Sequence, residues 1–360
     1  FNLKFVGNAS WSKYGRPLPI VCTPDSLDNY QLNTCLFEKN LCKATIPNGN
    51  PNPTDIGQIV YAGRDMSIKN STIVSNRIEI TLASGATELR VAPVMTLANI
   101  FLSHDMFLDN SVEVAAPEGC SIVESRAGMS MKTAASDPEA WKFVAAYNCT
   151  FAGDVPLPDL VDLGATNNKT CSYAANSILW ATGAAVEVPR AKVYGTGTGS
   201  GNGVELARCI VRAPELLGSG VWNSDFVAEE DPLLEPLAYL HADDPIPVIR
   251  CGARPPALTK GYDIRYTEYY THAEYGALLP GETLGRVRLN RDITPAHPLV
   301  KDALGADHPS GGFLLGALQQ TGADDKATVV ARARPLGRGT LDGSTRSISS
   351  PAFCASRLAS

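Results

Sequence analysis

Residues 261–291 read GYDIRYTEYYTHAEYGALLPGETLGRVRLNR and carry the most regular pattern in the chain. Successive side chains of a strand point to opposite faces, so alternation of apolar and polar residues predicts a strand with one buried face. The first half places an apolar set on one face: Tyr262, Ile264, Tyr266 and Tyr270. The second half alternates over residues 286–289, after a turn rich in Gly and Pro. We therefore predict a long antiparallel hairpin at the centre of the second half of the chain.

The face of this hairpin that points away from the predicted core is a candidate contact surface. It carries Arg265, Tyr269, Arg286 and Arg288. Tyrosine offers apolar area with a polar tip, and both Tyr and Arg are enriched where proteins meet. Any function of the hairpin is expected on these four side chains.

A second hairpin is predicted over residues 77–91. Ile78, Ile80 and Leu82 alternate with polar residues, residues 83–86 form a turn, and alternation resumes over residues 88–91. Other segments have the composition of further strands, and they include 112–114, 120–123, 141–151, 177–180, 208–212, 221–227, 312–318 and 327–334. Residues 94–108 fit a short helix or a buried strand equally well, and 229–240 and 295–304 are candidate short helices.

Short strands at intervals of roughly ten residues, separated by Gly and Pro, favour an all-β fold that is mainly antiparallel. We expect one or two β-sandwich or jelly-roll-like domains with few short helices. A parallel α/β fold would need helices of about a dozen residues between strands, and the pattern lacks them. We find no repeat of about 20 to 50 residues, which argues against propellers and solenoids.

A glycine-rich stretch over residues 195–203 is the candidate domain boundary. It has five glycines in nine residues and no side chain suited to packing. The predicted division is a β-rich domain over 1–194 with a loop-rich N-terminal arm, and a β-rich domain over 204–360 with an extended C-terminal tail.

The composition excludes several classes of protein. The hydrophobic fraction is 44% and the charged fraction 19%, which is typical of a folded globular chain and not of a disordered one. The net charge of -6 argues against a direct, sequence-specific nucleic-acid ligand. No apolar run approaches about 18 residues, so we predict no membrane-spanning helix. The opening at Phe1 shows no charged region leading into an apolar run, so we expect no signal peptide in this sequence.

Cysteines and glycosylation sequons favour an extracellular or particle-surface location, although an intracellular one stays open. None of the nine cysteines forms a C-x-x-C pair, and Cys22, Cys35 and Cys42 lie together in a loop-rich region, where we predict a disulfide. Asn-x-Ser/Thr sequons give the candidate glycosylation sites Asn8, Asn70, Asn148 and Asn168.

Searches for catalytic motifs yield no catalytic, cofactor or metal residue. The glycine-rich stretch lacks the Gly-Lys-Ser/Thr ending of a phosphate-binding loop, and no G-x-S-x-G occurs. The five histidines have no metal-binding spacing. Acidic runs at 229–231 and 243–244 are possible calcium ligands, but solvated loops explain them more simply.

The leading functional hypothesis is a structural or surface protein, such as a capsid-like subunit or an extracellular coat component, that self-associates through protein contacts. Two alternatives stay open. One is a secreted hydrolase of polysaccharide or ester, whose carboxylates the fold would bring together in a cleft. The other is a carbohydrate-binding or adhesion module, which would expose coplanar aromatic side chains from Trp11, Trp141, Trp180 and Trp222.

Overall fold

The structure is a computed structural model, and it consists almost entirely of β strands. It describes residues 2–12, 19–22, 30–46, 58–62, 66–82, 88–91, 93–96, 100–118, 121–124, 129–131, 144–153, 161–162, 171–181, 193–194, 203–212, 221–223, 226–261, 302–306, 314–319, 321 and 331–332. Within these residues helix is limited to the 3-10 turn η2 (Pro256–Thr259). Among these residues no helix is long and apolar enough to cross a membrane.

Four sheets contain most of the described strands. Sheet A runs in the order β1 (Lys4–Val6), β5 (Leu36–Glu38), β9 (Thr72–Val74), β14 (Met106–Leu108), β19 (Thr150–Gly153), β22 (Ile178–Ala181), β25 (Cys209–Val211), β27 (Val227–Ala228). Sheet B runs β15 (Ser111–Ala115), β10 (Arg77–Leu82), β6 (Leu41–Ile46), β2 (Ala9–Ser12).

The other two large sheets complete the cross-section. Sheet C runs β23 (Val193–Tyr194), β20 (Val161–Asp162), β17 (Met129–Met131), β12 (Val94–Thr96), β7 (Val60–Ala62), β3 (Val21–Cys22). Sheet D runs β26 (Val221–Asn223), β24 (Gly203–Ala207), β21 (Cys171–Ala175), β18 (Val144–Tyr147), β13 (Ile100–Ser103), β8 (Met66–Lys69), β4 (Tyr30–Asn33). Two smaller pairs are β11 (Glu88–Val91) with β16 (Ser121–Glu124), and β28 (Ala238–Tyr239) with β29 (Ala331–Arg332).

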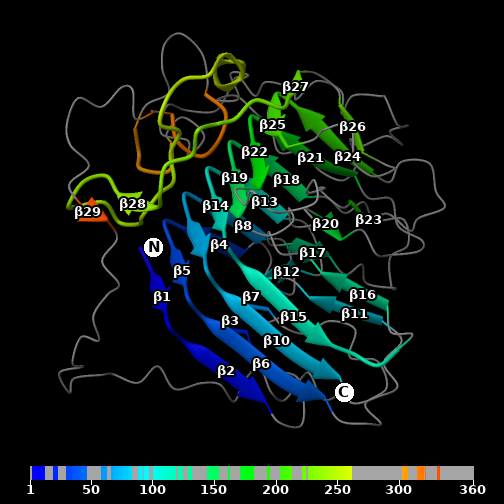
Figure 1. Ribbon diagram of the computed structural model, residues 1–360. Coiled ribbons are helices and arrows are strands. Elements are labelled where there is room, and N and C mark those ends of the chain that lie inside the picture. Colours follow the sequence, from blue (N-terminus) through cyan, green and yellow to red (C-terminus); the bar gives the residue numbers. More distant parts are fainter. Residues whose placement is uncertain are drawn as a thin grey trace.

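The chain visits these sheets in rotation, so it winds into a parallel β-helix. After β4 in sheet D it enters β5 in sheet A and β6 in sheet B, crosses to β7 in sheet C, and returns to sheet D at β8. Each strand therefore lies beside the equivalent strand of the next turn, and all pairs in the four sheets are parallel (Figure 1). Among the described strands, only β28 and β29 form an antiparallel pair.

The predicted antiparallel sandwich or jelly roll is wrong. The segments 77–82 and 88–91 are strands, but they do not form the predicted hairpin: β10 pairs with β6 and β15, and β11 pairs with β16. The expectation that the chain is not a solenoid is also wrong, because its turns stack into one. Successive turns place equivalent residues 32, 36 and 34 positions apart, and this uneven spacing hides the repeat in the sequence.

Corners of two residues, or of one residue between β24 and β25, join the strands of sheet D to those of sheet A, and those of sheet A to those of sheet B. The first residue of each corner has a positive φ, which turns the chain sharply. The corners before sheet A use Thr34, Asn70, His104, Asn148, Asn176 and Arg208, and the corners before sheet B use Gly7, Lys39, Ser75 and Asp109. Asn and Asp tolerate this conformation better than most residues, which accounts for part of this choice.

The corner between sheets A and B carries a stack of asparagines. Asn40 and Asn76 are fully buried and Asn110 nearly so. The backbone N–H and the Nδ2 of Asn40 donate to Oδ1 of Asn76, and Asn76 donates in the same way to Asn110. Nδ2 of each side chain also donates to a backbone carbonyl of the preceding turn, as Asn76 does to Phe37. The stack satisfies buried polar groups and holds successive turns in register.

Large apolar side chains fill the inside of the coil. Phe37, Ile73, Phe107, Phe151 and Leu179 occupy matching positions in successive strands of sheet A and are at most 1% exposed. Stacked rings add to this column, with centroids 4.9 Å apart for Phe5 and Phe37 and 5.2 Å apart for Phe107 and Phe151.

The described residues also bear on three further predictions. Residues 94–108 contain the strands β12, β13 and β14, not a helix. The candidate helix at 229–240 is wrong, because that segment is extended and pairs with residues 248–251. The division into domains at 195–203 stays a prediction, although strands on both sides of that stretch share sheets, as β21 and β24 do.

Candidate functional site: the outer faces of the coil

The outer face of sheet A is covered by a later part of the chain. We call residues 229–261, 302–306, 314–319 and 321 the cover. In Figure 1 its yellow and orange segments lie against sheet A. Outward side chains of the sheet are apolar and buried beneath it, and they include Leu36, Val74, Met106, Leu108, Ala152, Ile178 and Ile210. This face is therefore occupied by the chain itself.

Specific hydrogen bonds seat the cover on the sheet. Oγ1 of Thr72 donates to the carbonyl of Pro247 at 2.8 Å, and the N–H of Ala317 donates to Oγ1 of Thr150 at 3.1 Å. Nδ2 of Asn148 donates to the carbonyls of Leu314 and Gly316. Buried hydrogen bonds of this kind require one docking position, so the cover has a defined register on the sheet.

An ion pair and a buried carboxylate hold the cover together internally. The guanidinium of Arg250 is 5% exposed and pairs with Glu235. Asp302 is fully buried, and its carboxylate accepts N–H bonds from Leu304, Ala306 and Gln319. Burial raises the pKa of Asp302, while these hydrogen bonds act in the opposite direction.

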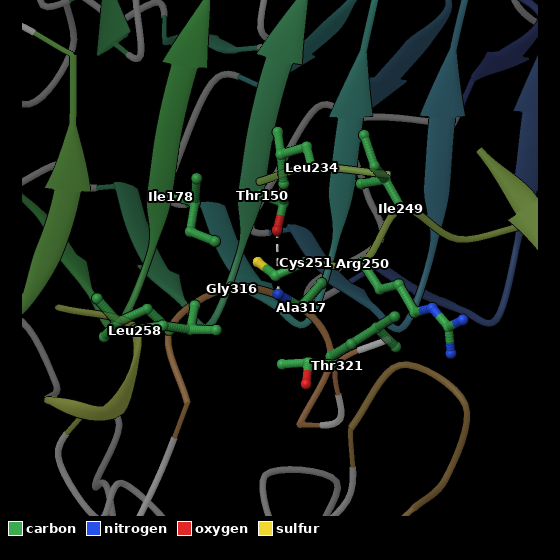
Figure 2. Close-up of a pocket in the computed structure, with 12 residues that line it drawn as sticks. Thr150, Ile178, Leu234, Ile249, Arg250, Cys251, Leu258, Gly316, Ala317 and Thr321 are labelled. Atoms are coloured by element: carbon green, nitrogen blue, oxygen red, sulfur yellow. Dashed lines mark hydrogen bonds between the residues drawn. The ribbon is translucent and has the colours of Figure 1, made fainter. Parts of the chain in front are cut away.

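A small cavity lies between the cover and sheet A (Figure 2). Its volume is about 10 Å³, near the lower limit for one water molecule. The lining includes Thr150 and Ile178 from the sheet, and Leu258, Gly316 and Thr321 from the cover. The dashed line in Figure 2 is the bond from Ala317 to Thr150. A space of this size fits a water and not an organic substrate.

A second polar stack occupies the corner between sheets D and A. Equivalent positions in successive turns carry Cys35, Ser71, Asp105, Cys149, Ser177 and Cys209, all of them fully buried. Oγ of Ser71 accepts the N–H of Cys35, and Oδ1 of Asp105 accepts the N–H of Ser71 at 2.8 Å. The second oxygen of Asp105 accepts the N–H of Ser103 at 3.0 Å. The carboxylate therefore serves as an acceptor between two turns.

Burial raises the pKa of Asp105 well above its ordinary value, although the bonds from Ser71 and Ser103 and the charge of Lys69 lower it. The folded chain then holds this proton more tightly than the unfolded chain does. The stability that results is complete below about pH 4 and is lost as the pH rises toward the folded-state pKa.

We expect the free energy of unfolding of the wild type to fall with rising pH over this window, by about 1.4 kcal/mol for each unit of pKa difference. The variant Asp105→Asn should be less stable throughout, because its Nδ2 meets a backbone donor, and should lack this slope. Urea unfolding from pH 3.5 to pH 8 measures both. Equal slopes in the two proteins would contradict the assignment.

Six cysteines whose side chains the structure describes form no disulfide, and they are Cys22, Cys35, Cys42, Cys149, Cys209 and Cys251. The predicted disulfide within 22, 35 and 42 is wrong, because these residues belong to sheet C, a corner and sheet B, on different sides of the coil. Burial raises the pKa of Cys42 and of Cys209 to about 12, so both remain protonated and unreactive at neutral pH.

The outer face of sheet B is exposed and charged. Lys43, Glu79 and Glu113 are neighbours in register along successive turns, and Arg77 lies beside them. Lys43 pairs with Glu79, and Arg77 pairs with Glu79 and Glu113. Exposed ion pairs of this kind contribute little to stability, but charges on a sheet face discourage unwanted sheet stacking.

The predicted contact residues Arg265, Tyr269, Arg286 and Arg288 lie outside the described residues, as does the whole predicted hairpin after Gly261. The described residues therefore leave this contact face a prediction. Within the parts of the chain that the structure describes, no group of His, Cys, Asp and Glu is placed to hold a metal ion.

The candidate glycosylation sites have different surroundings. Asn8 is exposed and Asn70 is partly buried, whereas Asn168 lies outside the described residues. Asn148 is fully buried and its Nδ2 bonds to two carbonyls of the cover, so the folded chain has no room for a glycan there.

The candidate tryptophans do not gather on one described surface. Trp11 in β2 is 73% exposed. Trp180 in β22 packs at the margin of the cover, with the guanidinium of Arg212 5.6 Å from its ring centroid. Trp141 lies outside the described residues, and of Trp222 only the backbone in β26 is described.

One recurring sequence pattern belongs to the coil and was missed. A large apolar residue followed three positions later by Asn occurs at Phe5 and Asn8, Phe37 and Asn40, Ile73 and Asn76, and Phe107 and Asn110. These are the interior column and the asparagine stack.

Comparison of the chain with protein families, curated proteins and solved structures finds no match.

Proposed function

We propose that this chain is a structural or surface protein that acts through protein contacts and assembles with copies of itself. The observation that carries the proposal is the continuous stacking of turns in sheets A to D. Parallel ladders, stacked asparagines and a filled interior couple each turn to the next, which gives a stiff body with flat sides. Such a body is suited to holding contact residues at fixed spacing.

Sheets A and B differ in what covers their outer faces, and this difference supports the proposal. The apolar face of sheet A is taken by the cover. The charged face of sheet B, with Lys43, Arg77, Glu79 and Glu113, faces outward. Contacts with other molecules are therefore left to exposed faces and to the ends of the coil. A place at a cell or particle surface is part of the proposal, and glycan mapping at Asn8 and Asn70 would test it.

We expect the full chain to self-associate, with a mean mass that rises above that of one chain as the concentration increases. Sedimentation velocity between about 1 and 100 µM, where weak specific contacts become populated, measures this. A single monomeric species over the whole range would overturn the proposal. Repeating the series at high salt separates ionic contacts from apolar ones, because salt screens exposed charges.

One observation favours the carbohydrate-binding alternative. Trp11 presents an exposed aromatic side chain on β2, and aromatic faces can stack on sugar rings. Quenching or shift of tryptophan fluorescence on a glycan panel, lost in Trp11→Ala, would support this alternative. The hydrolase alternative needs two facing acids in a cleft, and Asp105 and Asp302 are each enclosed by their own backbone donors.

A further inference from the structure

We propose that Asn148 is a glycosylation site of the chain before the cover docks, and that a glycan at Asn148 and the docked cover exclude each other. The reaction transfers an oligosaccharide from a pyrophosphate-linked donor to Nδ2 of Asn148. The bond from Nδ2 to the anomeric carbon forms, the bond from that carbon to the pyrophosphate oxygen breaks, and Nδ2 releases one proton. The inference rests on the surface location within the proposed function, and not on self-association.

The sequon that begins at Asn148 and the cover use the same two side chains. A sequon needs an Asn and a hydroxyl residue two positions later, and Thr150 supplies the hydroxyl. Nδ2 of Asn148 donates to the carbonyls of Leu314 at 2.8 Å and of Gly316 at 3.2 Å. Oγ1 of Thr150 accepts the N–H of Ala317 at 3.1 Å (Figure 2). The groups that define the sequon are therefore groups that hold the cover.

The docked cover leaves no space for a sugar at this sequon. Asn148 is fully buried and Thr150 is 2% exposed. An amide nitrogen has two hydrogens and Nδ2 of Asn148 donates to two carbonyls, so a bond to a sugar removes at least one of these hydrogen bonds. Even a Cβ added at Gly316 would lie only 2.9 Å from Oγ1 of Thr150. A glycan therefore keeps the cover undocked, and the docked cover keeps the transferase away.

The order of synthesis gives a transferase access before the cover exists. Leu314 and Gly316 follow Asn148 by 166 and 168 positions. Synthesis at about 5 to 20 residues per second makes them roughly 10 to 30 s after Asn148. During that interval the cover cannot occupy the sequon. Asn8 provides a comparison within the same chain, because its sequon is equally early and Asn8 is exposed after folding.

A refolding experiment on the full chain tests this order of events. The chain is unfolded in urea and diluted, and a purified oligosaccharyltransferase with its lipid-linked donor is added after increasing delays. Mass spectrometry of the glycopeptides measures occupancy at Asn148 and Asn8. We expect occupancy at Asn148 to fall about tenfold or more once the cover has docked, and occupancy at Asn8 to stay within about twofold. Occupancy at Asn148 that ignores the delay, or is absent at zero delay, would refute the proposal.

A matched pair of glycine variants separates docking of the cover from backbone strain. Gly316→Ala crowds Thr150, whereas Gly305 has nearly the same φ and an added Cβ there meets no atom within 4 Å. After refolding is complete, we expect Asn148 to be modified about tenfold faster in Gly316→Ala than in Gly305→Ala, with equal modification of Asn8. Equal rates at Asn148 in the two variants would show that the cover does not control access.

Limited proteolysis tests the exclusion from the opposite direction. Chains that carry a glycan at Asn148 should be cut in the cover faster than unmodified chains from the same refolding mixture. A cover that resists the protease equally well in both populations would contradict the exclusion. Failure of these tests leaves self-association standing, because sedimentation measures it separately, and a chain that stays monomeric does not affect the outcome at Asn148.

Discussion

Replacing Asn76 by alanine should lower the free energy of unfolding by about 4 kcal/mol, since the change leaves several buried polar groups without partners. The side chain is fully buried, and Oδ1 accepts both the backbone N–H and the Nδ2 of Asn40. Its own Nδ2 donates to Phe37 and to Asn110. Urea unfolding, followed by circular dichroism at neutral pH, measures the loss.

The matched control is Asn8→Ala, the first rung of the same stack. Asn8 is exposed, and Asn40 keeps the backbone N–H of residue 8 as a donor after the change. We expect a loss of less than about 1 kcal/mol, as for most exposed positions. Asn76→Asp separates the two roles of the amide, because the carboxylate still accepts from Asn40 but no longer donates to Phe37. Similar losses at positions 8 and 76 would show that the stack does not stabilise the coil.

The second large effect is expected at Gly316, where the backbone of the cover packs against sheet A without room for a side chain. Its φ is +89°, and an added Cβ would lie 2.8 Å from Cδ1 of Ile178 and 2.9 Å from Oγ1 of Thr150. Ile178 is 1% exposed, so its side chain has little room to move away. We expect Gly316→Ala to destabilise the docked cover by about 3 kcal/mol, from backbone strain and crowding together.

Gly305→Ala isolates the contribution of the backbone. Gly305 has nearly the same φ, +85°, but an added Cβ would meet no atom within 4 Å. The strain alone should cost about 1 to 2 kcal/mol. Limited proteolysis, which measures opening of the cover, should therefore cleave Gly316→Ala faster than Gly305→Ala, and the wild type most slowly. Equal cleavage of the two variants would mean that crowding against Ile178 and Thr150 plays no part.

The fold shows which features a sequence pattern can predict. Strands were placed correctly at 77–82 and 88–91, because alternation identifies a strand and its buried face. Alternation does not identify the neighbouring strand. A short turn such as residues 83–86 favours a hairpin, yet Ile78 pairs with Cys42 and Val112, which lie more than thirty residues away on either side. The free energy gained by pairing strands of successive turns outweighed the local preference for a hairpin.

The contact sites show the same division. Trp11 was named among the aromatic candidates, and its exposure on a terminal strand follows from the coil alone. Asn148 was named as a glycosylation site from its sequon, but the cover buries it through two hydrogen bonds. No local pattern around Asn148 reveals this, because the residues that enclose it come more than 160 positions later in the chain.

The sequence by itself determined that this chain is rich in short strands and that Gly, Pro or polar residues separate them. It also determined that no apolar run is long enough to span a membrane. These properties are local, since they depend on side chains within a few positions of each other. Only the tertiary structure decided that the strands are parallel, that Asn8, Asn40, Asn76 and Asn110 form one stack, and that the cover occupies sheet A. These properties depend on contacts between turns. The turns differ in length, so equivalent residues lack the regular spacing from which the repeat could have been predicted.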